Sequence, residues 1–228
     1  MISVAIDGPS GAGKSTLSRR LAKALGFLYV DTGALYRAVG LAALRAGAAT
    51  KDAAAVEALL PTTEVGLRYV EGEQRVFLNG EDVSAGIRQE AVGMAASDVS
   101  AHPAVRAFLL ETQRRLARES DVIMDGRDIG SVVLPDAQIK IFLTATAEDR
   151  ARRRTLELEA KGEKPDYDRI LQDVKTRDHN DSHRAAAPLK QAEGAILVDT
   201  TGNEFDQSYE ILLGLIREKL AQLGEKRP

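Results

Sequence analysis

A glycine-rich segment near the start of the chain constrains its fold more than any other feature. Residues 8–15 read GPSGAGKS, and they lie just behind the apolar run ISVAI of residues 2–6. Glycines let the backbone curl into a ring of inward N–H groups, and the positive end of a following helix adds to the attraction for an anion. The segment therefore predicts a strand, a loop that binds nucleotide phosphates, and a helix.

Each member of this loop has an expected contact. Lys14 is expected to reach the β- and γ-phosphates and to act in catalysis, and the Ser15 hydroxyl is expected to ligate Mg²⁺. An accidental glycine-rich turn is the alternative, but it leaves unexplained why lysine and serine stand at the required positions between a strand and a helix. The residues expected to bind the phosphates of ATP are Gly8, Ser10, Gly11, Ala12, Gly13, Lys14, Ser15 and Thr16.

Two aspartates follow apolar strands close to the loop. Asp7 precedes Gly8 directly, and Asp125 follows the apolar residues 122–124. Either carboxylate could hold water ligands of a loop-bound Mg²⁺ ion, and Asp125 is the preferred candidate. The expected cofactor arrangement is Mg²⁺ bound together with ATP as the phosphoryl donor.

Apolar segments alternate with helical patterns over most of the chain. Leu17, Leu21 and Leu25 repeat every four residues after the loop, and Gly26 supplies a C-terminal stop. Further short strands are expected at residues 27–30, 122–124, 139–143 and 195–198. The alternation predicts an α/β fold of the P-loop NTPase type, with a five-stranded parallel sheet and helices on both faces.

Two segments interrupt this alternation. Residues 64–83 contain two apolar runs around a turn at residues 71–73, which predicts a small antiparallel β insert. Residues 145–188 are highly charged, and they indicate a helical lid over the site. A solvated helical face is the alternative for the arginines of this segment that are lid candidates, Arg150, Arg152, Arg153 and Arg154. The expected division is a core of residues 1–60, 100–144 and 189–228, an insert at about 61–99, and a lid at about 145–188.

Composition narrows the partners of the chain. A net charge of −3 over 228 residues argues against a dedicated nucleic-acid binder. The absence of cysteine excludes disulfides and thiolate metal sites. The sequence shows neither a leader-like segment nor a long apolar span, so we expect a cytoplasmic protein without a membrane partner.

A phosphate loop alone does not separate a switch, a motor and a small-molecule kinase. The chain has no Asn-Lys-x-Asp segment for reading guanine, and it is short for a motor. Polar residues follow the second and third strands at 31–37 and 125–128, where open α/β sheets bind their ligands. This pattern favours a kinase, with a non-catalytic nucleotide-binding module as the alternative.

Five segments together resemble the signature of bacterial cytidylate kinases. They are DGPSGAGK at 7–14, DTGALYR at 31–37, GEDVS at 80–84, DGRDIG at 125–130 and RAAAPL at 184–189. The resemblance extends over nearly the whole chain. It implies a monomeric kinase with a CMP-binding insert and a mobile lid, which transfers the γ-phosphoryl group of MgATP to CMP or dCMP. A kinase for another nucleotide or small metabolite is the nearest alternative.

The resemblance also implies how cytosine is read. Cytosine presents an amine beside two acceptors, so Asp128 is expected to accept from the amine and Arg106 to donate to N3 and O2. Ser97 resembles a third base contact. Thr32 stands where the family usually has serine, and an N-cap of the second helix is an alternative or additional role for it. For Ser97 and Arg106, ordinary surface polarity is the alternative.

The remaining site residues follow from the same resemblance. Arg37 and Arg127 match ligands of the acceptor phosphate and, with Lys14, are the expected catalytic residues. The acceptor is mostly a dianion near neutral pH, so no general base is expected and catalysis should consist of alignment and charge neutralisation. The residues expected on the sugar and phosphate side of CMP are Arg177, Asp181 and Arg184; a solvated loop is the alternative for the segment around Asp181.

Overall fold

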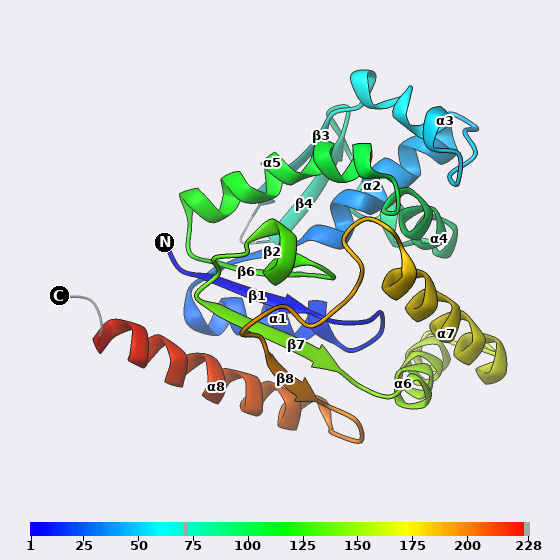
Figure 1. Cartoon of the computed structure of the whole chain (residues 1–228). Helices are drawn as coiled ribbons and strands as arrows, with labels where there is room; N and C mark the ends of the chain where they lie inside the picture. Colours follow the sequence, from blue (N-terminus) through cyan, green and yellow to red (C-terminus); the bar gives the residue numbers. More distant parts are fainter. Residues whose placement is uncertain (71–72, 226–228) are drawn as a thin grey trace.

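The computed structural model describes residues 1–70 and 73–225 and contains a parallel sheet with a smaller antiparallel sheet beside it (Figure 1). The larger sheet has the order β2-β6-β1-β7-β8, and all its strands are parallel. The predicted five-stranded parallel sheet is therefore confirmed. Its strands are β1 (Ser3–Asp7), β2 (Leu28–Asp31), β6 (Val122–Gly126), β7 (Ile139–Thr144) and β8 (Ile196–Asp199).

Helices cover both faces of this sheet, as the sequence predicts. Val4 and Ile6 of β1 point into a core that includes α1 (Lys14–Leu25) and α8 (Phe205–Glu225). Ala5, between them, points into a second core on the opposite face, with α5 (Pro103–Glu119) and the π-helical turn η3 (Ile129–Val133). This alternation explains why the strands read as continuous apolar runs. Within residues 1–70 and 73–225, no helix is both long and apolar enough to cross a bilayer.

The antiparallel insert is also present. Strand β4 pairs with β3 on one side and β5 on the other. The insert contacts the edge strand β2 through two side chains: the Tyr69 hydroxyl donates to the Tyr29 carbonyl at 2.7 Å, and Gln74 bonds to the main chain of Asp31. Part of the predicted turn, residues 71–72, lies outside the described residues. The elements of this region are α3 (Ala53–Glu57), η1 (Leu60–Thr62), β3 (Val65–Val70), β4 (Glu73–Leu78), β5 (Glu81–Asp82) and η2 (Gly86–Arg88).

The charged segment expected to be a lid forms two helices, α6 (Ala147–Ala160) and α7 (Tyr167–His183), which pack on each other at one end of the sheet (Figure 1). Gly162, with a φ of 81°, lies in the connection between them. Because α7 also contacts α4 (Glu90–Val99), the segment reaches across to the helices beside the insert.

Helix α2 (Thr32–Arg45) crosses α4 closely, and a glycine permits the crossing. A Cβ atom added at Gly40 would lie 2.9 Å from the Ala96 nitrogen and 3.1 Å from the Ala95 carbonyl carbon. These distances leave no room for a methyl group. The crossing matters for function because α2 and α4 carry several of the predicted acceptor-site residues.

Two glycine substitutions should therefore have opposite effects. Gly40→Ala should lower the free energy of unfolding by about 1–3 kcal/mol, because the added methyl group pushes α4 away from α2. Gly214→Ala, in the exposed middle of α8 with open space around it, should raise it by about 0.5–1 kcal/mol through helix propensity. Chemical denaturation of both variants tests this, and equal effects of the two would contradict the close crossing.

Candidate active site

The loop after β1 has the backbone that phosphate binding requires. Gly8, Gly11 and Gly13 have φ values of 150°, 78° and 84°, a range that residues with a side chain rarely adopt. At Gly8 an added Cβ would lie only 1.9 Å from the Leu143 carbonyl oxygen of β7. The predicted strand, loop and helix are present, and the loop is pressed against the neighbouring strand.

Lys14 lies inside the loop with no carboxylate directly on its ammonium group among the described residues. Its Nζ donates to the Pro9 carbonyl at 2.7 Å, and the residue is 5% exposed. Burial lowers the pKa of Lys14, and the nearby Arg127 guanidinium lowers it further. A phosphate placed in the loop would supply the missing negative charge.

The Ser15 hydroxyl and Asp125 meet beneath the loop. Ser15 Oγ donates to Asp125 Oδ2 at 2.8 Å, and the Tyr29 hydroxyl donates to Asp125 Oδ1 at 3.0 Å. Burial raises the pKa of Asp125 to about 6, and the Asp31 carboxylate contributes to the rise. A hydroxyl and a carboxylate are the hard oxygen donors that suit Mg²⁺, which takes few protein ligands when substrate phosphates supply the others. The described residues contain no cluster of three or more metal-binding side chains.

Asp7, the other candidate for the metal, is engaged elsewhere. Its two carboxylate oxygens accept from the main-chain nitrogens of Ile129 and Gly130 at 2.7 and 2.8 Å, and it is 3% exposed. With both oxygens used by the turn η3, Asp7 is poorly placed to hold metal-bound water. The preference for Asp125 is consistent with this geometry.

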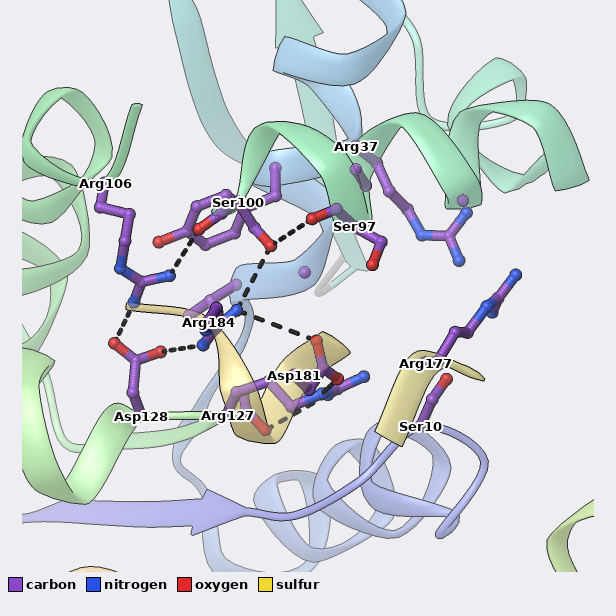
Figure 2. Close-up of a pocket in the computed structure, with 16 residues that line it drawn as sticks. Ser10, Arg37, Ser97, Ser100, Arg106, Arg127, Asp128, Arg177, Asp181 and Arg184 are labelled. Atoms are coloured by element: carbon purple, nitrogen blue, oxygen red, sulfur yellow. Dashed lines mark hydrogen bonds and ion pairs between the residues drawn. The ribbon is translucent and has the colours of Figure 1, made fainter. Parts of the chain in front are cut away.

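A cavity adjoins the loop at Ser10 and is lined by every residue predicted to bind the acceptor, so we call it the acceptor cavity (Figure 2). Its walls come from α2, α4, α5, the segment after β6, and α7. The described lining includes five arginines and two aspartates, a surplus of three positive charges that suits an anionic ligand. The predicted residues that line it are Ser10, Thr32, Arg37, Ser97, Arg106, Arg127, Asp128, Arg177, Asp181 and Arg184.

One end of this cavity holds a carboxylate between two guanidinium groups. Arg106 donates to Asp128 Oδ2, and Arg184 Nη2 lies 3.7 Å from Asp128 Oδ1. Arg106 also donates to the Ser100 carbonyl at 3.2 Å and lies over the ring of Tyr36. Figure 2 shows this cluster facing the α4 wall that carries Ser97. The result is a fixed acceptor beside fixed donors.

The rest of the cavity is mainly cationic. Arg127 pairs with Asp181 at 2.7 Å, while Arg37 donates to the Ile87 carbonyl at 2.9 Å. Arg177 Nη2 lies 3.4 Å from the Met94 sulfur. Burial lowers the pKa of Arg37, which indicates a guanidinium short of counter-charge.

The N-cap interpretation of Thr32 is wrong. Asp31 caps α2, since its carboxylate accepts from the Ala34 nitrogen at 3.0 Å. Thr32 is the first residue of the helix, and its hydroxyl donates to the Asp125 carbonyl at 2.8 Å. Gly126 makes this approach possible, because a Cβ there would lie 2.8 Å from Thr32 Oγ1.

Six residues of the cavity wall were not among the predicted site residues: Gly33, Tyr36, Gly93, Ala96, Ser100 and Gly126. Tyr36 had a usable signal, because it stands one helical turn after Thr32 and next to Arg37 in sequence. Ser100 had none, since it lies just beyond α4 and joins the site only through the fold.

The four arginines of α6 that are lid candidates differ in burial and in their contacts. Arg150 is buried, and it donates to the carbonyls of Ala145 and Ser10 and to both oxygens of Asp178. Arg153 donates to the Thr200 carbonyl and pairs with Asp149. Arg152 and Arg154 are exposed, so a solvated face describes those two.

Comparison with known proteins adds an independent observation. The profile of the family described as cytidylate kinase matches residues 4–218. The chain is 50% identical over 214 residues to a cytidylate kinase of Caldicellulosiruptor bescii, covering 94% of this chain and 95% of that protein. It is 49% identical over 216 residues to a cytidylate kinase of Syntrophotalea carbinolica, covering 95% and 92%. A gluconokinase structure from Sinorhizobium meliloti has a similar fold, with a TM-score of 0.51 at 14% identity over 99% and 98% of the two chains.

Two arginines one turn apart on α6 give a matched test of this geometry. Arg150→Lys should lower the free energy of unfolding by roughly 2–3 kcal/mol, because one ammonium group cannot serve all the acceptors that the guanidinium serves. Arg154→Lys, which changes an exposed arginine paired with Glu157, should change it by less than about 0.5 kcal/mol. Denaturation curves of the two variants test this prediction. Similar stabilities would show that the hydrogen bonds of Arg150 do not stabilise the fold.

Proposed function

Because the chain belongs to the cytidylate kinase family, we propose that it transfers the γ-phosphoryl group of ATP to CMP or dCMP, releasing ADP and CDP or dCDP. The observation that carries this proposal is the acceptor cavity, which joins the phosphate loop at Ser10 and ends in the cluster of Asp128, Arg106 and Arg184. A ligand with a phosphate at one end and a cytosine at the other matches both ends.

Base selection follows from donors and acceptors. Asp128 accepts from the exocyclic amine of cytosine, while Arg106 donates to the ring acceptors and Ser97 adds an adaptable hydroxyl. Uracil has a carbonyl in place of the amine, so it would bring an acceptor against the Asp128 carboxylate. Binding of uracil would leave the buried Asp128 carboxylate without a donor from the base. The free-energy penalty for this unpaired charged group makes the site select cytosine over uracil.

Transfer relies on alignment and charge neutralisation. Arg37 and Arg127 hold the attacking phosphate, and Lys14 neutralises charge on the transferring group inside the loop. Arg177, Asp181 and Arg184, from α7 and the residue that follows it, hold the sugar and phosphate side of the acceptor. The acceptor phosphate is itself the nucleophile and is mostly ionised near neutral pH, so no side chain has to remove a proton.

The metal requirement is part of the proposal. Ser15 would ligate Mg²⁺ directly, and Asp125 would hold its water ligands, displacing their present hydrogen bond to each other. When bound with ATP, Mg²⁺ neutralises charge on the β- and γ-phosphates. The loop contacts of Gly8, Ser10, Gly11, Ala12, Gly13 and Thr16 belong to the same donor site.

The charged arm and the cellular setting complete the proposal. Closure of the outer ends of α6 and α7 over the site would exclude water, which otherwise competes with CMP for the phosphoryl group. Arg153 lies beside the loop, with its Nη1 atom 4.0 Å from where a Cβ of Gly13 would stand. We place the protein in the cytoplasm, where ATP and CMP are available, and we expect it to act as a monomer.

The reaction itself is tested by measuring ADP release with CMP, dCMP, UMP, AMP and shikimate as acceptors. CMP and dCMP should support turnover, and UMP should be much poorer. ATP binding without any acceptor-dependent ADP release would leave a nucleotide-binding module. Preference for AMP or shikimate would identify a kinase of another class.

Asp128→Asn should weaken the choice of base. The amide retains an acceptor for the cytosine amine but also offers a donor to uracil, so the ratio of kcat/KM for CMP to that for UMP should fall about 10- to 100-fold. Asp136→Asn, in an exposed loop, is the control and should keep the wild-type ratio. An unchanged ratio in Asp128→Asn would remove this carboxylate from base recognition.

Arg127→Ala should affect turnover far more than donor binding. Loss of a cation that holds the attacking phosphate should lower kcat by about 10³-fold or more, while ATP affinity stays nearly the same. Arg118→Ala, which changes an exposed arginine paired with Glu111, should have wild-type kinetics. Steady-state kinetics with equilibrium ATP binding tests both, and a normal kcat in Arg127→Ala would contradict the assignment.

A further inference from the structure

Asp128 stands where an aspartate normally caps a helix, yet it does not cap one. It immediately precedes the turn η3, whose first N–H groups need acceptors outside the turn. Its carboxylate makes no capping hydrogen bond to any described residue and meets Arg106 and Arg184 instead. The expected local partner of those N–H groups is therefore turned into the acceptor cavity.

Other aspartates of this chain behave differently. Asp31, Asp52 and Asp166 each precede a helix, and each carboxylate accepts from nitrogens in the first turn of its own helix. Aspartate at this position is favoured in general because it satisfies those nitrogens. Asp128 is thus an exception among the aspartates that precede helices, and it lines the acceptor cavity.

Asp7 supplies the missing cap from the end of β1. One oxygen accepts from the Ile129 nitrogen at 2.7 Å and the other from the Gly130 nitrogen at 2.8 Å. Burial raises the pKa of Asp7 to about 6, so the interior holds a carboxylate there at some free-energy cost.

We infer that Asp7 is a positioning residue for base recognition: by capping the turn η3, it leaves the Asp128 carboxylate free to face the acceptor base. The inference rests on the proposed function. Without Asp7, the uncapped nitrogens of Ile129 and Gly130 attract the carboxylate of Asp128, the residue that directly precedes the turn. Asp128 then turns away from Arg106, and the amine of cytosine loses its acceptor.

Position in the chain gives this residue a second significance. Asp7 directly precedes Gly8, so one strand end carries both the first residue of the phosphate loop and the cap of the base-reading segment. The two substrate sites therefore share a covalently continuous support.

The test is a double-mutant cycle on base selectivity. Asp7→Asn keeps the shape of the side chain but points an NH₂ group at one of the two main-chain N–H groups. The ratio of kcat/KM for CMP to that for UMP should fall about tenfold or more, since a displacement of about 1 Å in a positioned group can reduce rates by 10²-fold. In the Asp128→Asn background, Asp7→Asn should leave the ratio unchanged, because its effect passes through Asp128.

A purely structural role predicts another result. General loosening would lower kcat/KM for CMP and UMP equally, and that outcome, or an additive effect in the double variant, overturns the inference. Ile216→Val, a buried change in the remote helix α8, controls for a modest stability loss and should keep the ratio. If Asp7→Asn does not fold, Asp7→Glu, whose longer side chain displaces the carboxylate from the nitrogens of Ile129 and Gly130, should lower the ratio in the same direction, and an unchanged ratio there also overturns it.

Assays of the wild-type protein distinguish a failure of the proposed function from a failure of the role inferred for Asp7. If it releases no ADP in response to CMP, the proposed function fails. If it strongly prefers CMP and Asp7→Asn keeps that preference, the function stands and only the role of Asp7 fails.

Discussion

Three adjacent parallel strands end in buried aspartates, and the rest of the site depends on how these charges are satisfied. Asp7, Asp31 and Asp125 end or nearly end β1, β2 and β6, and they are 3%, 5% and 3% exposed. Buried carboxylates are tolerated only when hydrogen-bonded. Each therefore takes a different partner: Asp7 a turn, Asp31 a helix start, and Asp125 two hydroxyl groups. Together they fix the segments that carry the functional side chains.

Above this edge the protein holds more positive than negative charge. The cations of the acceptor cavity come from helices and loops far apart in sequence. Among the contacts of the described residues, Arg37 donates to a main-chain carbonyl and Arg177 lies against a sulfur atom, and neither forms an ion pair with a carboxylate. Such groups are already oriented before a phosphate arrives, so little reorganisation is needed when negative charge develops during transfer. The family membership and this arrangement support one another: a site that neutralises two phosphate-bearing ligands is what a nucleoside monophosphate kinase requires.

Much of the fold could be predicted because its signals are local. The glycine pattern at residues 8–13 and the repeat of Leu17 and Leu21 determine the first strand, loop and helix. The turn η3 was not predicted, since its cap, Asp7, lies 122 residues away from Ile129. The burial of Arg150 could not be predicted either, because its partner Ser10 lies 140 residues away in the sequence. Local patterns gave the types of residue at the site, whereas their partners required the tertiary structure.

The contacts of Arg150 also determine where the charged arm can bend. This guanidinium joins the loop at Ser10, the start of α6 and, through Asp178, the second half of α7. Its hydrogen bonds hold those three segments together at one point. A lid motion that keeps these hydrogen bonds is confined to the outer tip, where Gly162 lies between the two helices. The proposed lid is therefore shorter than the charged segment as a whole, because it begins on the solvent side of Arg150.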